Sequence, residues 1–121
     1  MKNEYIAGDL VKYLSQVVKI VEVYQDGTCY FGNETMCGQQ DCKDAEQIPL
    51  TTKILEKNGW KKFKRSYSRD YCYRRNGYPT LNICSENEVY FHWGDHNKSI
   101  TAVHQLQHLL FGLELNSEME V

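Results

Sequence analysis

The fold is decided by one C-terminal stretch, Ser99-Ile-Thr-Ala-Val-His-Gln-Leu-Gln-His-Leu-Leu-Phe-Gly-Leu-Glu-Leu-Asn116. Its apolar residues recur at spacings of three and four, which places them on one side of a helix: Ile100, Val103, Leu106, Leu110 and Leu113. We expect Ser99 or Thr101 to cap this helix, with Ile100 as a hydrophobic staple. The apolar side must be buried, and the chain before it predicts strands, so an α+β fold is expected.

Composition excludes several classes of protein. The chain has 121 residues, of which 41% are hydrophobic and 25% charged, as is typical of one globular domain. A formal net charge of −2 gives no general attraction to nucleic acid or membrane. No apolar run approaches the ~20 residues of a membrane span, and Met1-Lys-Asn-Glu-Tyr5 lacks the apolar core of a signal peptide. We expect a single cytoplasmic domain over residues 1–121 with no membrane contact.

Residues 10–24 fit two structures. Their apolar positions have helical spacing, yet most of Val17-Val-Lys-Ile-Val-Glu-Val23 is β-branched and a turn signal, Gln25-Asp-Gly27, follows at once. We therefore predict a strand that returns through Thr28-Cys-Tyr-Phe31 as a hairpin.

The next segments predict a loop, an edge strand and a short helix. Residues 32–47 are polar and without period, which predicts a long loop. Ile48-Pro-Leu50 reads as an edge strand, because proline cannot donate to a ladder. Thr51 or Thr52 is expected to cap a helix over residues 53–58, which Gly59 ends.

Residues 60–93 predict an antiparallel meander. The first hairpin pairs residues 60–67 with 69–75, and Asn76-Gly77 is a strong signal for the next turn. Two more strands are expected over residues 80–84 and 88–93, joined by a turn at 85–87 and followed by a break at 94–97.

Five pieces in this order carry a resemblance: Gly8-Asp9-x-Val11, Val18-Lys-Ile-Val21, Ile48-Pro-Leu-Thr51, Ile54-Leu-Glu-Lys-Asn-Gly-Trp60 and Val103-His-Gln-Leu-Gln107. Through them, nearly the whole chain resembles a family of small uncharacterised proteins of Bacteroides-type gut bacteria, often encoded in phage-derived or mobile regions. The family has no assigned activity, so the resemblance implies an architecture and a phage-related context but no catalytic residues. The insertion with Cys37 and Cys42 is longer than is usual there, and no family role is carried onto it.

The resemblance and the segments imply the same α+β architecture. Residues 1–50 form a small β-barrel-like part that resembles an SH3-like barrel. Residues 51–121 add a short helix, the antiparallel meander and a closing C-terminal helix on which the meander packs.

Cysteine and histidine positions raise the question of a metal. The chain has five cysteines, an odd number that favours free thiols in a chain with no secretion signal: Cys29, Cys37, Cys42, Cys72 and Cys84. Cys37 and Cys42 form the only close pair, and no second pair completes a zinc set. We expect no metal and no cofactor, and interpret these two as solvated loop thiols.

All four histidines lie near the C-terminus, at His92, His96, His104 and His108. The last two are four residues apart on the predicted helix and could in principle share a metal. Gln105 stands where a zinc-protease helix would carry its glutamate, so no general base is supplied. We interpret them as histidines that hydrogen-bond at the edge of the helix–sheet contact.

The first two meander strands carry a basic, aromatic pattern. The candidate residues are Lys61, Lys62, Lys64, Arg65, Arg69, Tyr71, Tyr73, Arg74 and Arg75, with Tyr67 and Tyr78 nearby and only Asp70 opposing the charge. Such a face can hold single-stranded nucleic acid, with phosphates on the cations and bases stacked on the rings. Strand alternation offers the plainer reading, in which the rings point inward and the charges are solvated.

No complete catalytic arrangement is visible. Cys72 and Cys84 lie on predicted strands, where a thiol usually serves packing, and Asp95-His96 has no nucleophile placed beside it. We expect a non-catalytic binding module with a protein partner whose identity, like the oligomeric state, the sequence does not encode. The alternatives are a nucleic-acid-binding accessory protein that uses residues 61–75, and a small metal- or thiol-dependent enzyme.

Overall fold

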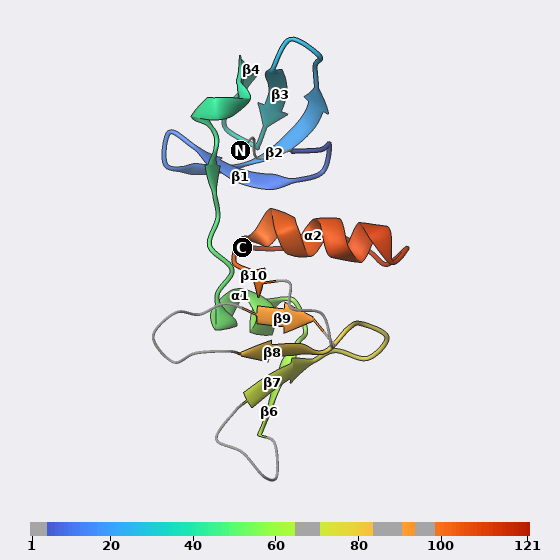
Figure 1. Ribbon diagram of the computed structural model, residues 1–121. Coiled ribbons are helices and arrows are strands. Elements are labelled where there is room, and N and C mark those ends of the chain that lie inside the picture. The colour runs from blue at the N-terminus through green and yellow to red at the C-terminus, as the bar shows by residue number, and fades with distance from the viewer. Residues whose placement is uncertain (1–4, 65–70, 84–90, 94–98) are drawn as a thin grey trace. The chain divides into compact units, whose positions relative to one another are not determined.

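Two antiparallel sheets and two α-helices make up the part of the chain that the computed structural model describes, residues 5–64, 71–83, 91–93 and 99–121 (Figure 1). The chain divides into two compact units, Met1–Ile48 and Pro49–Val121. The first unit holds one sheet, and the second holds the other sheet with both helices, which confirms the α+β class.

The sheet of the first unit has the strand order β4-β3-β2-β1-β5. Its elements are β1 (Leu10–Tyr13), β2 (Gln16–Val23), β3 (Thr28–Gly32), β4 (Cys37–Asp41), the 3-10 helix η1 (Cys42–Asp44) and β5 (Glu46–Gln47). The predicted hairpin is confirmed. β2 and β3 pair from Val23 opposite Cys29, next to the turn, to Lys19 opposite Gly32, and Gly27 in the turn has a φ of +89°. Residues 10–24 are therefore strands and not a helix.

The prediction of a long loop over residues 32–47 is wrong, because this segment contains β4, η1 and β5. β4 reads Cys-Gly-Gln-Gln-Asp and has no buried residue, so it shows no apolar alternation. β4 is a strand because its main chain pairs with all five residues of β3, and not because of a pattern in its side chains. In the described residues β4 and β5 lie at opposite edges of the sheet and do not pair, so the sheet is not a closed barrel.

A buried cluster lies against one face of this sheet: Tyr5, Val11, Val18, Ile20, Cys29 and Phe31. Along β2, Val18 and Ile20 are buried, and Val21 points to the other face with 55% of its surface exposed. The register with β3 shifts at a bulge between Ile20 and Glu22. Asp9, almost fully buried, ties the N-terminal segment down: its carboxylate accepts from the Ile6 N–H at 2.9 Å, and its carbonyl accepts from the Ile20 N–H at 2.8 Å.

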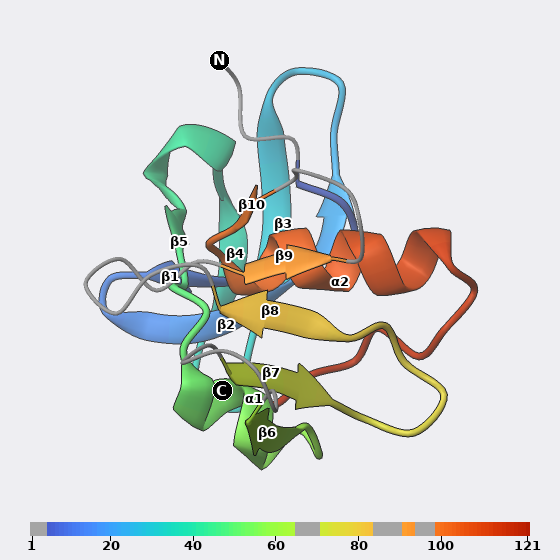
Figure 2. The same cartoon turned by 60° about the horizontal axis from the view of Figure 1, so that its bottom comes forward.

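The second unit begins with α1 (Thr52–Lys57), capped as expected by Thr51, whose hydroxyl accepts from the Ile54 N–H at 3.2 Å. Gly59 ends the turn with a φ of +93°. The meander is confirmed with strand order β10-β9-β8-β7-β6. Its strands are β6 (Lys61–Lys64), β7 (Tyr71–Arg74), β8 (Leu81–Ile83), β9 (Phe91–Trp93) and β10 (Ser99–Ile100), as Figure 2 shows. The turn expected at 85–87 and the break at 94–97 lie outside the described residues.

The closing helix α2 (Val103–Gly112) begins later than expected. Ser99 and Ile100 pair with β9 instead of starting the helix, so neither Ser99 nor Thr101 is its cap. Ala102 occupies the cap position, and the Gln105 side chain accepts from the Thr101 N–H at 2.8 Å. Four positions of the predicted apolar stripe are confirmed as buried, Val103, Leu106 and Leu110 on α2 and Ile100 on β10. Leu113 lies beyond the helix and is 39% exposed.

The segment 48–50 forms less structure than the predicted edge strand. Pro49 makes one isolated antiparallel bridge to Ala102, and the Leu50 N–H donates to the Thr101 carbonyl at 2.9 Å. Because proline has no N–H, the pairing does not extend into a longer ladder.

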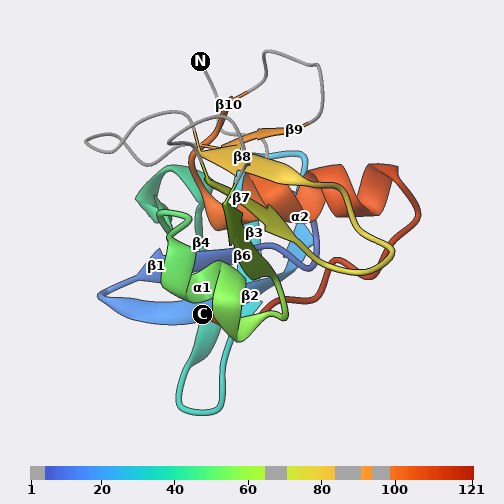
Figure 3. The same ribbon diagram turned by 90° about the horizontal axis from the view of Figure 1, so that it is seen from below.

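The residues after α2 return to α1 (Figure 3). The Asn58 amide donates to the Glu120 carbonyl at 2.7 Å, and its oxygen accepts from the Glu120 N–H at 2.8 Å. The same amide also donates to the Ile54 carbonyl at 2.8 Å. One side chain therefore joins the end of α1 to the C-terminal segment.

Neighbouring residues of β2 test the assignment of the first unit's core. Ile20→Ala should lower the free energy of unfolding of this unit by about 2–5 kcal/mol, because it opens a cavity beside Val18 and Phe31. Val21→Ala, one residue away at the exposed bulge, should cost under about 1 kcal/mol. Urea denaturation of both variants measures the difference, and equal losses would contradict the assigned face.

Candidate functional site

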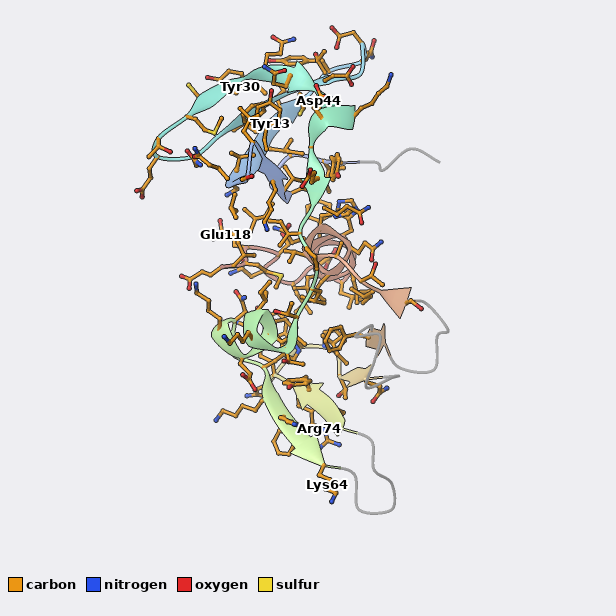
Figure 4. The ribbon with its side chains drawn as sticks, turned by 90° about the vertical axis from the view of Figure 1, so that its left-hand side faces the viewer. Tyr13, Tyr30, Asp44, Lys64, Arg74 and Glu118 are labelled. Carbon is orange, nitrogen blue, oxygen red and sulfur yellow. The ribbon has the colours of Figure 1, made fainter. Side chains whose placement is uncertain are left out.

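A two-stranded ribbon at the edge of the second unit's sheet carries Lys61, Lys62, Lys64, Arg74 and Arg75. It consists of β6, β7 and the following Arg75, and we call it the basic ribbon. β6 is the edge strand, and all four of its residues are exposed. The register pairs Lys61 with Arg74 and Phe63 with Cys72. Lys64 and Arg74 are labelled on the two strands in Figure 4.

One face of the basic ribbon carries Lys61, Phe63, Cys72 and Arg74. Cys72 is 1% exposed, so this face is covered there, and we call its three exposed residues, Lys61, Phe63 and Arg74, the outer face. Lys61 and Arg74 are directly opposite one another, and paired side chains on one face lie about 4.5–5.5 Å apart at Cβ. The Arg74 guanidinium carbon lies 5.4 Å from the centroid of the Phe63 ring, which is 45% exposed. The outer face therefore combines two adjacent cations with a solvent-exposed aromatic ring.

Tyr73 is on the opposite face of the ribbon and belongs to the core. It is 1% exposed, and its ring meets Phe91 edge-on with centroids 6.3 Å apart. Burial raises the pKa of Tyr73, and the nearby Glu56 carboxylate raises it further. Tyr73 is thus not available to stack on a nucleobase, which removes it from the candidate set.

Arg75 occupies a corner built from two aromatic rings. Its guanidinium carbon lies 4.0 Å from the centroid of the Tyr78 ring and 5.2 Å from that of Trp60. The two rings meet edge-on, 5.4 Å apart. The Arg75 side chain also passes close to Gly59, where a Cβ would lie 3.4 Å from the Arg75 Nε. We call Trp60, Arg75 and Tyr78 the Arg75 corner.

Not every candidate residue can be placed. Arg65, Arg69, Tyr67 and Asp70 lie outside the described residues, and Tyr71 is placed in β7 by its backbone alone. Lys62 and Lys64 are exposed, and they alternate with the outer face along the edge strand. The structure thus brings together Lys61 and Arg74 on one face, with Arg75 next to them at the end of the ribbon.

The predicted Cys37–Cys42 pair is separated by β4. These residues begin and follow a five-residue strand, so they lie about 16 Å apart along it. Cys42 instead packs against the cluster that contains Cys29. Burial, and after it the interaction with the Cys42 thiol, raises the pKa of Cys29 to about 11. Sequence reasoning missed this pair because it assigned Cys42 to a loop.

Histidine spacing predicts the observed neighbours on α2. The His104 and His108 rings meet edge-on with centroids 5.5 Å apart, and His104 is buried. Within the described ranges, no three His, Cys, Asp or Glu side chains converge as a metal site would require. His96 and Asp95 are outside those ranges, and nothing is described of the His92 side chain.

Of the two thiols considered for catalysis, Cys72 is 1% exposed and is closed to a substrate, while Cys84 is not among the described residues. Among the helices that the structure describes, neither α1 nor α2 is long and apolar enough to cross a bilayer. No protein-family model, curated protein or solved structure matches the chain. The candidate site is therefore argued from its own geometry.

The cysteines should differ sharply in reactivity. Iodoacetamide reacts with thiolates, so the exposed Cys37 should be alkylated well before Cys29, which is 2% exposed and has a pKa raised to about 11. Peptide mapping by mass spectrometry after timed alkylation measures both rates, and alkylation in denaturant, where the rates should converge, is the control. Equal rates in the folded protein would contradict the placement of Cys29.

Proposed function

We propose that this protein is a non-catalytic binding module that holds an acidic segment of a partner protein against the outer face of the basic ribbon. The observation that carries the proposal is the register of β6 with β7, which sets Lys61 directly opposite Arg74. Like charges in this position repel one another and destabilise the sheet. A carboxylate placed between them would replace that repulsion with two attractive contacts.

The surroundings of this pair support an anionic partner. Among the described residues, no acidic side chain forms an ion pair with Lys61 or Arg74, and both are exposed. Phe63 adds apolar surface to the same face, as the centre of a small interface requires. Each exposed ion pair contributes only about 0–1 kcal/mol, so the partner segment should carry several carboxylates.

Lysines on an edge strand also have a simpler role, because they discourage edge-to-edge association of sheets. That role accounts for Lys61, Lys62 and Lys64 on β6. It does not account for Arg74, which lies on the inner strand β7, nor for the exposed ring of Phe63. The pairing of Arg74 with Lys61 therefore still carries the proposal, and the exposed ring of Phe63 supports it.

A nucleic acid is the second candidate, favoured by the exposed aromatic ring among cations. Single strands are held by stacking bases on aromatic rings as well as by phosphate contacts. Here Tyr73 is buried, and the Arg74 guanidinium lies over the Phe63 ring. Little aromatic surface is left for bases, so a protein partner is the better match.

The strand order of the first unit supports the architecture expected for residues 1–50. Its order β4-β3-β2-β1-β5 pairs β1 with both β2 and the last strand, and a 3-10 helix precedes that strand. We propose on this basis that it is an SH3-like, partly open barrel. A phage or mobile-element setting is proposed only from the resemblance of the sequence.

Binding of a fluorescein-labelled poly-glutamate peptide tests the proposal. Lys61→Gln with Arg74→Gln should raise Kd at least about tenfold, because both cations that face the peptide are lost. Lys43→Gln with Lys53→Gln removes the same charge from exposed positions elsewhere and is the matched control. Fluorescence anisotropy at several salt concentrations measures Kd.

Two results would contradict the proposal. The first is an equal loss in both double variants, which would mean that only net charge matters. The second is tighter binding of a single-stranded oligonucleotide than of the peptide at physiological salt, abolished by Phe63→Ala, which would favour the nucleic-acid reading.

A further inference from the structure

The Arg75 corner holds a guanidinium against two aromatic rings. The Tyr78 ring lies under the guanidinium and the Trp60 ring beside it. Two hydrogen bonds to backbone carbonyls link the residues of the corner. The Tyr78 N–H donates to the Arg75 carbonyl at 2.9 Å, and the Trp60 indole N–H makes a longer contact of 3.5 Å to the Pro79 carbonyl. Trp60 is 1% exposed, so this wall does not move freely.

A guanidinium has five N–H donors along its edge, and stacking on a ring satisfies none of them. In the described residues, no acceptor takes a hydrogen bond from the Arg75 side chain, which is half-buried. Partial burial strips water from a charge and makes unfilled donors costly. If Arg75 served only to pack against the two rings, we would expect its N–H donors to bond a nearby acceptor of the protein. Instead, the donors that find no acceptor in the described part of the chain are free to bind a ligand that brings its own acceptors.

The fork of a guanidinium matches a carboxylate or phosphate group through two parallel hydrogen bonds. Holding the fork in advance reduces the conformational entropy lost when such a group binds. Arg75 follows Arg74 directly at the end of β7, and its guanidinium lies against Trp60 and Tyr78, whereas that of Arg74 lies over Phe63. Because successive residues of a strand point to opposite faces, a partner that contacts both arginines has to pass around the end of the ribbon.

We propose that Arg75 binds one carboxylate of the acidic partner through a bidentate pair, and so fixes the register of that partner on the basic ribbon. This inference rests on the proposed function for the source of the carboxylate, but the oxyanion site itself does not. Arg75 then fixes the position of the partner, whereas Lys61 and Arg74 attract it by their charge.

Two measurements separate geometry from charge. Acetate titrated into the wild-type protein should shift the NMR signal of the Arg75 Nε–H in a saturable way, and shift that of Arg74 less. For the poly-glutamate peptide, Arg75→Lys keeps the charge but loses the planar fork, and should raise Kd about tenfold. Tyr78→Leu should weaken binding as well, because it removes the ring that positions the guanidinium. Lys53→Gln on α1 should leave Kd nearly unchanged.

Each outcome is decisive for one of the two proposals. An acetate shift without peptide binding would support the carboxylate site and overturn the proposed function. Peptide binding that Arg75→Lys leaves unchanged would overturn the inference and leave the proposed function standing. A shift with inorganic phosphate but none with acetate would overturn the carboxylate assignment. The acetate titration uses the wild-type protein, so it decides the matter even if Arg75→Lys does not fold.

Discussion

Pairing of β7 on both of its edges is the constraint on which the site depends. On one edge, Tyr73 is opposite Leu81 of β8, and both are almost fully buried. This register commits Tyr73 to the core, and alternation then sends Arg74 to the other face. On the other edge, the register with β6 places Lys61 against Arg74. A shift of one residue would reverse every face and bring Arg74 into the core, at the cost of burying a charge.

The two arginines that end the ribbon illustrate how differently adjacent residues are used. Arg74 is exposed and lies over the exposed Phe63 ring, whereas Arg75 lies in the corner between Trp60 and Tyr78. The difference comes from the surroundings and not from the side chain. An isolated surface cation contributes little, whereas a preoriented fork can select the shape of its ligand.

Much of the architecture could be predicted from local signals, such as the β-branched run of β2, the glycine turn after it, and the threonine and glycine that bound α1. β4 escaped prediction because its main-chain pairing with β3 leaves no apolar pattern in its side chains. The placement of Ile100 in a strand could not be predicted, because Ile100 would be buried in a strand and in a helix alike. Only its pairing with Phe91, which comes from the fold, makes it part of β10. For the site, the cations were visible, but the burial of Tyr73 and the Arg75 corner depend on residues that meet only in the fold.

The hydrogen bonds between the Asn58 side chain and the Glu120 backbone affect where this protein would deamidate. Asn58-Gly59 and Asn76-Gly77 are both sequences in which a glycine nitrogen can attack the preceding side-chain amide and release ammonia. At Asn58 that nitrogen donates to the Glu56 carbonyl at 3.2 Å, and the amide is held by Ile54 and Glu120. Asn76 is exposed in a turn. Deamidation should therefore begin at Asn76, close to the arginines, and add a negative charge there. At Asn58 it would exchange a donor for an acceptor that faces two carbonyl oxygens, and so release the C-terminal segment.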